Sequence, residues 1–319
     1  MQHVALIGAG PMAEAYHAVL THLGVAVTVF GRGDQSAQRF ASRVGVAPGT
    51  GPLAPQLDRQ AARFDAAIVA VGVNELPEAT LALLDRDIAK ILVEKPGAPT
   101  PAQMVEIAAR DTGERVRIAY NRRFLRSTGL AREIIAGDGG ITSFSFEFTE
   151  VLNRVAAANH RASVLQHWVI ANSSHVIDMA FDLAGAAPDL SDVAVLGAVA
   201  RGNLAWHPPG SRFAVCGTVG DAIFTGQADW ESGGGWAVEL CTRDHRLRLR
   251  PLEALSLQRT GAFVIEPVTV PAEPDGLKPG LPGMVRAFLA AGDCRTLPTA
   301  KQQLQRMRLY EQIVSHPTE

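Results

Sequence analysis

Short apolar runs alternate with amphipathic stretches over the first 120 residues. The runs are rich in Val, Ile and Ala, which is typical of strands buried on both faces of a parallel sheet. We expect strands at 3–7, 25–30, 64–71, 90–94 and 115–120. Helical patterns separate them at about 11–20, 36–44, 76–84 and 101–110, and Pro and Gly residues mark a loop at 48–55. This alternation predicts an α/β fold with a doubly wound parallel sheet.

The pattern changes after residue 120. Phe144, Phe146 and Phe148 alternate with polar residues in 141–148, as expected for a half-buried antiparallel strand. We expect helices at 127–136, 166–183, 284–291 and 301–315, and further strands at 193–199, 212–218, 222–227, 236–242, 247–250 and 263–270. The chain is thus predicted to hold two domains, 1–120 and 121–319. The second is α+β with a large, mostly antiparallel open sheet, and helix 301–315 is a candidate to pack back on the first.

Composition and charge exclude several classes of protein. The chain has 319 residues, 47% hydrophobic and 19% charged, with a net charge of −2. This balance gives no electrostatic basis for binding nucleic acid or an anionic membrane. Cys216, Cys241 and Cys294 lie far apart and suggest neither a metal site nor a disulfide framework. No apolar run approaches the length of a membrane span. We therefore expect a soluble, cytoplasmic protein without a bound metal.

A glycine-rich loop follows the first expected strand directly. Its pattern is Gly8-x-Gly10-x-x-Ala13, and Pro11 and Met12 fill the variable positions. The first glycine permits a tight turn, the second lets backbone approach a pyrophosphate, and Ala13 allows close helix packing. The N–H groups at the helix start favour an anion. We predict a dinucleotide site here, with Val71 and Glu94 at the ends of neighbouring strands.

The residues after the second strand bear on the choice between NAD and NADP. An NAD site usually has an acidic residue at the end of this strand, but the chain has Gly31 and Arg32, and Asp34 follows later. Arg32 could pair with a 2′-phosphate, which favours NADP. The alternative is a solvated Arg32 with Asp34 bound to the ribose of NAD.

The run Ile91–Gly97 ends the fourth strand with Glu94, Lys95 and Pro96. Ligands in open α/β sheets bind beyond the carboxyl ends of the strands, where Lys95 is expected. The Lys95–Pro96 bond is a candidate for the cis form. By itself the motif is better explained by a solvated lysine at a strand end.

Four motifs together resemble one enzyme family. They are Gly8–Ala13, Val93–Gly97, Tyr120–Phe124 and His175–Asp178, in this order. In order and spacing they are similar to the glucose–fructose oxidoreductase / inositol dehydrogenase / MocA (Gfo/Idh/MocA) family of NAD(P)-dependent oxidoreductases. The resemblance implies a Rossmann domain, an open sheet through which copies often form homo-oligomers, and hydride transfer on a sugar-, sugar-nucleotide- or cyclitol-like alcohol or ketone.

The same resemblance suggests roles for two residues. Lys95 matches the family lysine that orients the substrate oxygen, and His175 matches the histidine that acts as general acid/base. Histidine titrates near neutral pH and so suits proton exchange with an alcohol. The aspartate that the family often has four residues before this histidine is replaced by Ala171.

Further residues are candidates for substrate binding because they lie on the expected ligand edge or near His175. They are Tyr120, Asn121, Arg122, Arg123, Trp168, Asn172 and Asp178. For the arginines, Trp168 and Asp178 there is an alternative. An arginine could form an ion pair at the domain junction, Trp168 could fill the core, and Asp178 could orient the imidazole or cap neighbouring structure.

The expected function is NAD(P)-dependent oxidation or reduction of a carbohydrate-like CH–OH group, with NADP favoured over NAD. Two alternatives remain open from the sequence. One is a non-catalytic NAD(P)-binding sensor on the same fold, since the carboxylate partner of His175 is absent. The other is a reductase of a non-sugar substrate.

Overall fold

A computed structural model describes residues 2–60, 63–86, 88–158, 160–274, 276–290 and 296–314. Contacts between Cα atoms divide the chain into two compact units. The first unit comprises the chain up to Ala119 together with Pro274–Leu304. The second comprises Tyr120–Glu273 and the residues from Gln305 onwards. Helix α11 (Ala300–Ile313) therefore begins in the first unit and ends in the second.

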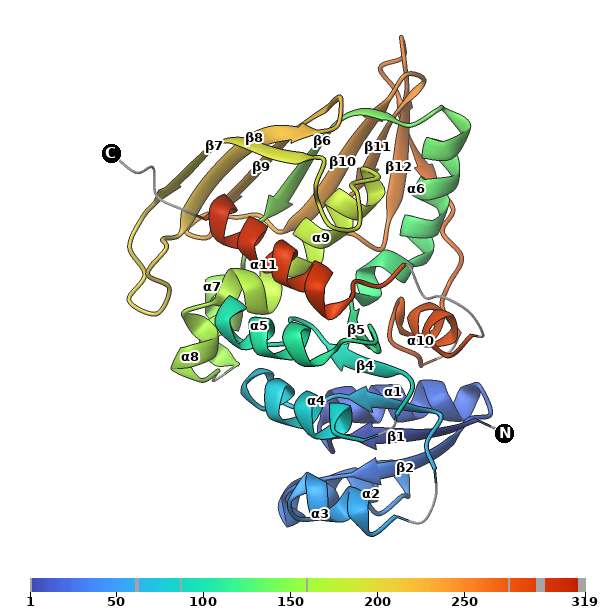
Figure 1. The fold of residues 1–319 in the computed structure, drawn as a ribbon. Helices are drawn as coiled ribbons and strands as arrows, with labels where there is room; N and C mark the ends of the chain where they lie inside the picture. The colour runs from blue at the N-terminus through green and yellow to red at the C-terminus, as the bar shows by residue number, and fades with distance from the viewer. Residues whose placement is uncertain are drawn as a thin grey trace. The chain divides into compact units, whose positions relative to one another are not determined.

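The first unit contains a parallel sheet in the order β2-β1-β3-β4-β5 (Figure 1). Its strands are β1 (His3–Ile7), β2 (Ala26–Phe30), β3 (Ala66–Val69), β4 (Ile91–Glu94) and β5 (Val116–Ala119). A parallel bridge between Phe30 and Gly49 adds one more partner beside β2. With this partner the order becomes that of dinucleotide-binding folds, in which the crevice lies between the first strand and β3.

The helices of the first unit fall into two groups whose members contact each other. Helix α1 contacts α2 and α10, and α4 contacts α3 and α5, as two layers on opposite faces require. The bounds are α1 (Pro11–His22), α2 (Asp34–Val44), α3 (Leu53–Asp58), η1 (Val73–Glu75), α4 (Leu76–Leu84), α5 (Pro101–Arg110) and α10 (Leu281–Leu289). Thr100 caps α5 by accepting from the Gln103 N–H.

The second unit contains an eight-stranded sheet in the order β13-β12-β11-β10-β6-β9-β8-β7. Among these strands β6 and β9 pair in parallel and the other neighbours are antiparallel. The bounds are β6 (Ile141–Phe148), β7 (Val193–Arg201), β8 (Arg212–Val219), β9 (Ala222–Asp229), β10 (Trp236–Thr242), β11 (His245–Leu249), β12 (Leu255–Arg259) and β13 (Ile265–Val268).

Helix α9 (Ser174–Leu183) packs on β6 and β10 and covers the apolar face of this sheet. Phe181 of α9 meets Phe144, Phe146 and Phe224, with ring centroids 5.1–5.8 Å away. Other helical segments of the unit are η2 (Asn121–Phe124), α6 (Arg126–Gly137), α7 (Leu152–Ala157), α8 (Ala162–Leu165) and a π-helical segment, Val169–Ser173.

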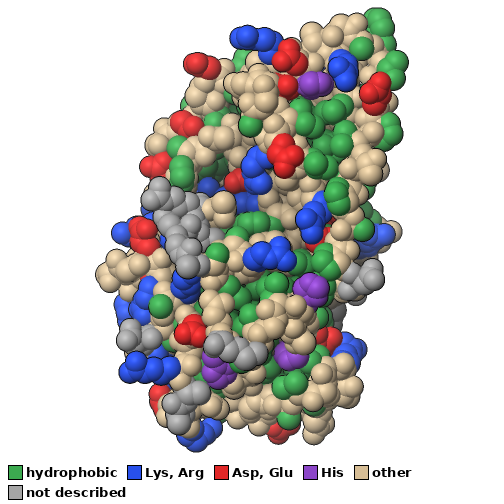
Figure 2. All heavy atoms as spheres, turned by 90° about the vertical axis from the view of Figure 1, so that its right-hand side faces the viewer, with side chains coloured by type: hydrophobic (Ala, Val, Ile, Leu, Met, Phe, Trp, Pro, Cys, Tyr) green, Lys and Arg blue, Asp and Glu red, His purple; other side chains and the backbone are tan. Residues whose placement is uncertain are grey.

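The predicted fold class is confirmed: a parallel N-terminal sheet is followed by a larger, mostly antiparallel one. Two local predictions were wrong. The expected loop at 48–55 includes the start of α3, whose Pro55 lies in the first turn, where proline is tolerated. Strand β12 was not predicted, because Ser256, Gln258 and Arg259 give Leu255–Arg259 little apolar content. Side chains of both charges are interspersed on the face in Figure 2, in keeping with the net charge.

We predict that the phenylalanine cluster stabilises the second unit. Phe224 is fully buried, with ring centroids 5.1 Å from Phe181 and 5.5 Å from Phe144. Phe224→Ala should lower the free energy of unfolding by about 3–5 kcal/mol, because it leaves a cavity in this cluster. The neighbouring Ile223 is 60% exposed, and Ile223→Ala should change it by about 0.5 kcal/mol or less. Urea denaturation would measure both; equal effects would contradict the prediction.

Candidate active site

The turn after β1 has the shape that a dinucleotide phosphate requires. Gly8 has φ = +126°, and a Cβ added there would lie 2.3 Å from the Ala70 carbonyl oxygen at the end of β3. A Cβ added at Gly10 would meet no protein atom within 4 Å. Gly10 caps α1, whose first N–H groups have no partner within the helix. The loop thus lies against β3 and leaves open space at the helix start, which fits a pyrophosphate.

Arg32 lies just beyond β2, as predicted, and its side chain is 71% exposed. Its Nη2 atom is 3.6 Å from Oε1 of Glu75, which belongs to the short helix after β3. The sequence analysis did not identify Glu75 as its partner. Asp34 is exposed at the start of α2. Because the guanidinium of Arg32 is largely exposed, this pair contributes little stability.

Glu94 closes β4 and accepts a hydrogen bond of 2.6 Å from the Tyr16 hydroxyl. Tyr16 is fully buried in α1, so this bond joins the helix after the glycine loop to the strand before Lys95. Burial raises the pKa of Glu94, and the Tyr16 hydrogen bond and the charges of Lys95 and Lys278 partly offset this rise. Burial also raises the pKa of Tyr16.

Lys95 lies at the carboxyl end of β4 and is half-buried. The Lys95–Pro96 bond is cis, as the sequence suggested. Gly97 (φ = +83°) donates its N–H to the Glu94 carbonyl at 3.0 Å and closes a tight turn. The Gln303 side chain of α11 donates to the Pro96 carbonyl at 3.0 Å. The backbone around Lys95 is therefore held from both sides within the first unit.

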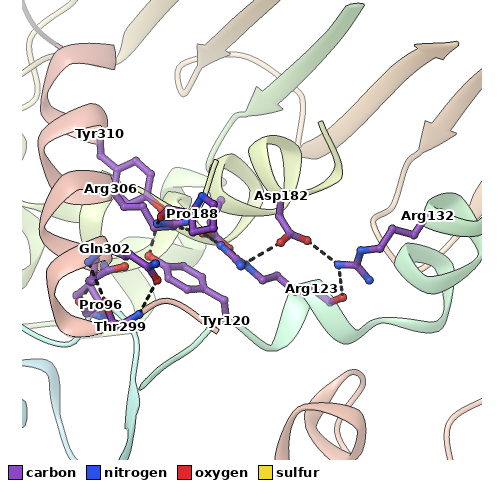
Figure 3. Close-up of polar contacts among 12 residues, drawn as sticks. Pro96, Tyr120, Arg123, Arg132, Asp182, Pro188, Thr299, Gln302, Arg306 and Tyr310 are labelled. Atoms are coloured by element: carbon purple, nitrogen blue, oxygen red, sulfur yellow. Dashed lines mark hydrogen bonds and ion pairs between the residues drawn. The ribbon is translucent and has the colours of Figure 1, made fainter. Parts of the chain in front are cut away.

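His175 is the second residue of α9 in the second unit, where aromatic rings surround it. Its ring centroid is 5.9 Å from that of Trp236 and 6.3 Å from that of Tyr120. The Tyr120 hydroxyl lies 3.2 Å from the Tyr310 hydroxyl of α11 (Figure 3). Burial raises the pKa of Tyr310, so its phenol is a neutral hydrogen-bonding group at neutral pH.

Asp178 and Arg123, two predicted substrate ligands, bind each other in the interior of the second unit. Arg123 Nε and Nη2 lie 2.7 and 2.6 Å from the two Asp178 carboxylate oxygens. Arg306 Nε donates to Asp178 at 3.1 Å, and Arg123 also pairs with Asp182 (Figure 3). Burial by itself would lower the pKa of Arg123. The Asp178 and Asp182 carboxylates outweigh this effect and raise the pKa above its usual value. This geometry favours the structural alternative for both residues.

A carboxylate that the sequence analysis missed lies beside the start of the His175 helix. Glu150 follows β6 and is 7% exposed. It accepts from Asn172 Nδ2 at 3.0 Å through both oxygens, and from Ser173 Oγ at 2.7 Å. Burial raises the pKa of Glu150, and the hydrogen bonds from Ser173 and Asn172 partly offset the rise. The only signal for Glu150 in the sequence was an acidic residue at a strand end.

A cavity of about 440 Å³ opens beside Glu150. Three predicted substrate ligands line it: Arg122, Trp168 and Asn172. The other four, Tyr120, Asn121, Arg123 and Asp178, are buried in the same unit and do not line this cavity. Its remaining lining residues are Thr149, Glu150, Val151, Arg154, Val155, His160, Gly235, Trp236, Pro251, Leu252 and Glu253.

Among the residues that the structure describes, no three or more His, Cys, Asp or Glu side chains group so that they could hold a metal ion. Cys216 and Cys241 are free thiols, and Cys294 lies outside the described part. No described helix has the length and apolar character needed to cross a membrane.

Residues 2–121 match the model of the Gfo/Idh/MocA oxidoreductase family, described as an NAD-binding Rossmann fold. Over residues 2–121 the chain thus matches the NAD-binding Rossmann domain of this oxidoreductase family, and the resemblance found in the sequence is confirmed. The chain has no match among curated proteins.

Solved structures share the fold over nearly the whole chain. An oxidoreductase from Agrobacterium radiobacter, in complex with NAD+, L-tartaric acid and magnesium, has a TM-score of 0.79 at 13% identity, covering 97% of this chain and 94% of its own. A Gfo/Idh/MocA family oxidoreductase from Vibrio cholerae has 0.74 at 19%, covering 98% and 97%. A levoglucosan dehydrogenase in complex with NADH and levoglucosan has 0.75 at 17%, covering 98% and 96%.

We predict that Asp178 is essential for stability. Asp178→Asn removes the carboxylate that the buried Arg123 and Arg306 share and should lower the free energy of unfolding by about 3–5 kcal/mol. Asp85→Asn is the matched control. It removes an exposed ion pair with Arg110 and should cost about 1 kcal/mol or less. Urea denaturation would measure the free energy of unfolding of both variants. A loss in Asp178→Asn as small as that in Asp85→Asn would contradict the prediction.

Proposed function

We propose that the protein is an NAD(P)-dependent oxidoreductase that transfers a hydride between the nicotinamide and a secondary alcohol or ketone of a carbohydrate-like substrate. The observation that supports it most is the turn at Gly8 and Gly10, which fits a pyrophosphate at the start of α1. The family match of residues 2–121 supports the same cofactor. The levoglucosan dehydrogenase with the same fold supports a sugar-like substrate. A sugar nucleotide or a cyclitol remains within this class.

In this proposal the bound nicotinamide supplies the hydride acceptor or donor. Lys95 orients the substrate oxygen and stabilises the charge that develops on it. His175 takes up or returns the hydroxyl proton as general acid/base. The tight turn at Gly97 and the Gln303 hydrogen bond to Pro96 hold the backbone beside Lys95, and the Tyr120 and Trp236 rings flank the imidazole.

We further propose a preference for NADP, with Arg32 as the ligand of the 2′-phosphate. Arg32 is exposed just beyond β2, and its Nη2 atom lies 3.6 Å from Oε1 of Glu75. A 2′-phosphate carries more charge than Glu75 and accepts bidentate hydrogen bonds from a guanidinium.

The sheet of the second unit is the proposed surface for homo-oligomers. Leu196 and Val199 of β7 are 73% and 41% exposed, so this strand offers apolar side chains that a second copy could cover. The cytoplasmic location expected from the sequence stays a prediction.

Variants of Lys95 and His175 test the proposed chemistry. Oxidation of levoglucosan, D-glucose and myo-inositol would be screened by nicotinamide absorbance with the wild-type protein. With an accepted substrate, Lys95→Ala and His175→Ala should each lower kcat by about 10²–10⁴-fold, because each removes a group that acts on the reacting oxygen.

Lys301→Ala and His22→Ala serve as controls for these variants, because both side chains are exposed on helices. Both controls should keep wild-type turnover, and His175→Ala should still bind NADH. Wild-type turnover in Lys95→Ala and His175→Ala would exclude the mechanism. No turnover of any secondary alcohol would favour a sensor.

The cofactor preference is tested by titrating NADH and NADPH and following their fluorescence. Arg32→Ala should weaken NADPH binding by about 10–100-fold and leave NADH binding unchanged, because only the 2′-phosphate contact is lost. Glu75→Gln should strengthen NADPH binding, since it removes the competing carboxylate. Arg39→Ala, an exposed arginine of α2, is the control. A wild-type preference for NADH would contradict the proposal.

A further inference from the structure

After the open sheet the chain returns to the first unit and places a lysine beside the glycine loop. Lys278 lies in the segment Pro274–Leu304, which belongs to the first unit, although it is 266 positions from Met12 in sequence. Its Nζ atom is 2.8 Å from the Sδ atom of Met12, in the first turn of α1. A thioether is a weak hydrogen-bond acceptor, so this contact mainly shows where the ammonium lies. The ammonium is at the helix start where a pyrophosphate is expected.

A second interaction places Lys278 at the carboxyl edge of the parallel sheet. Its charge acts on the Glu94 carboxylate at the end of β4 and partly offsets the rise in pKa that burial causes there. In the sheet, β3 lies between β4 and β1, the strand that precedes the glycine loop. Lys278 thus contacts the loop after β1 and interacts with the end of β4. Dinucleotides bind at this edge of such sheets.

The position of Lys278 is set by contacts within the first unit. Its carbonyl accepts from the Leu281 N–H at 3.1 Å, and Gly280, with φ = +75°, turns the backbone into α10. Helix α10 contacts α1, and its Leu281 is fully buried. Lys90, just before β4, donates to the Ala290 carbonyl at the end of α10 at 2.6 Å. Both ends of α10 are therefore tied to this unit, and Lys278 lies directly before it.

The composition of the glycine loop favours a cation beside it. The first N–H groups of a helix have no partner within the helix, but Pro11, the first residue of α1, has no N–H. Glu94 adds an acidic group, joined to α1 by the hydrogen bond from Tyr16. A pyrophosphate carries two negative charges, which a nearby cation stabilises. The proposed mechanism places Lys95 on the substrate oxygen, so Lys278 is the lysine that fits this role.

We propose that the Lys278 ammonium binds the pyrophosphate of the dinucleotide, together with the N–H groups at the start of α1. Lysine binds phosphate as a point charge, and the pyrophosphate is common to NAD and NADP, so this contact does not discriminate between them. The role differs from that proposed for Arg32, which is confined to the 2′-phosphate. The identification of the ligand as a dinucleotide rests on the proposed oxidoreductase function.

Nucleotide binding to the full chain, without turnover, tests this proposal. NADH and NADPH are followed by their fluorescence, and ADP-ribose, which has the pyrophosphate but no nicotinamide, by isothermal titration calorimetry. Lys278→Ala should weaken all three by about 10-fold, because each loses the same contact between a cation and a phosphate. Added salt should narrow the difference between the wild type and Lys278→Ala, since ions screen an exposed charge pair.

Lys301→Ala is the matched control, because Lys301 is an exposed lysine of the same unit on α11. It should bind all three nucleotides as the wild type does. Lys278→Arg keeps the charge and should keep most of the affinity. If Lys278→Ala does not fold, Lys278→Gln should show the same loss. Wild-type affinity of the variant for ADP-ribose, a loss confined to NADPH, or an equal loss in Lys278→Arg would overturn the proposal.

The same titrations separate the role of Lys278 from the proposed function. If the wild-type protein and Lys278→Ala bind NADH and ADP-ribose equally well, only the role of Lys278 is rejected. If Lys278→Ala loses affinity as expected but the wild type turns over no secondary alcohol, the role of Lys278 is supported and the oxidoreductase function is rejected. If the wild type binds none of the three nucleotides, both are rejected.

Discussion

The need to compensate buried charge determines how the second unit is held together. Asp178 lies in the middle of α9 and has almost no contact with solvent, so its carboxylate must be paired. Arg123 reaches it from the segment that follows β5, and Arg306 from α11. Three segments far apart in sequence are thereby fixed around one carboxylate. Because α9 also carries His175, the same ion pairs set the orientation of the proposed acid/base.

Most of the fold could be predicted because its signals are local. The alternation of Phe144, Phe146 and Phe148 indicates which face of β6 is buried, and the buried residues are those three. Apolar runs likewise marked each parallel strand. Prediction failed where the residues of a segment do not favour one secondary structure. Leu255–Arg259 is a strand because β11 and β13 pair with it on its two sides, not because of its own residues.

The cofactor loop and the surroundings of Glu150 also differ in how far local sequence signals predict them. The cofactor loop is one continuous motif between a strand and a helix, so Gly8 and Gly10 could be identified from spacing. Glu150 and its donors are 22 and 23 residues apart, and Tyr16 is 78 residues from Glu94. Such pairs are created by tertiary packing and have no periodic signature. In the sequence alone, Glu150 is one acidic residue among 32, and only the folded chain brings it to Asn172 and Ser173.

The π-helical segment Val169–Ser173 affects how positions near His175 should be compared between proteins. A π-turn places one more residue in each hydrogen-bonded ring than an α-turn does. The residue four positions before the histidine therefore points in a different direction around the helix axis than it would in a regular α-helix. The alanine found there by counting and the aspartate of other family members need not occupy equivalent places in space. Substitutions around this turn should be aligned by structure before any loss of function is inferred from them.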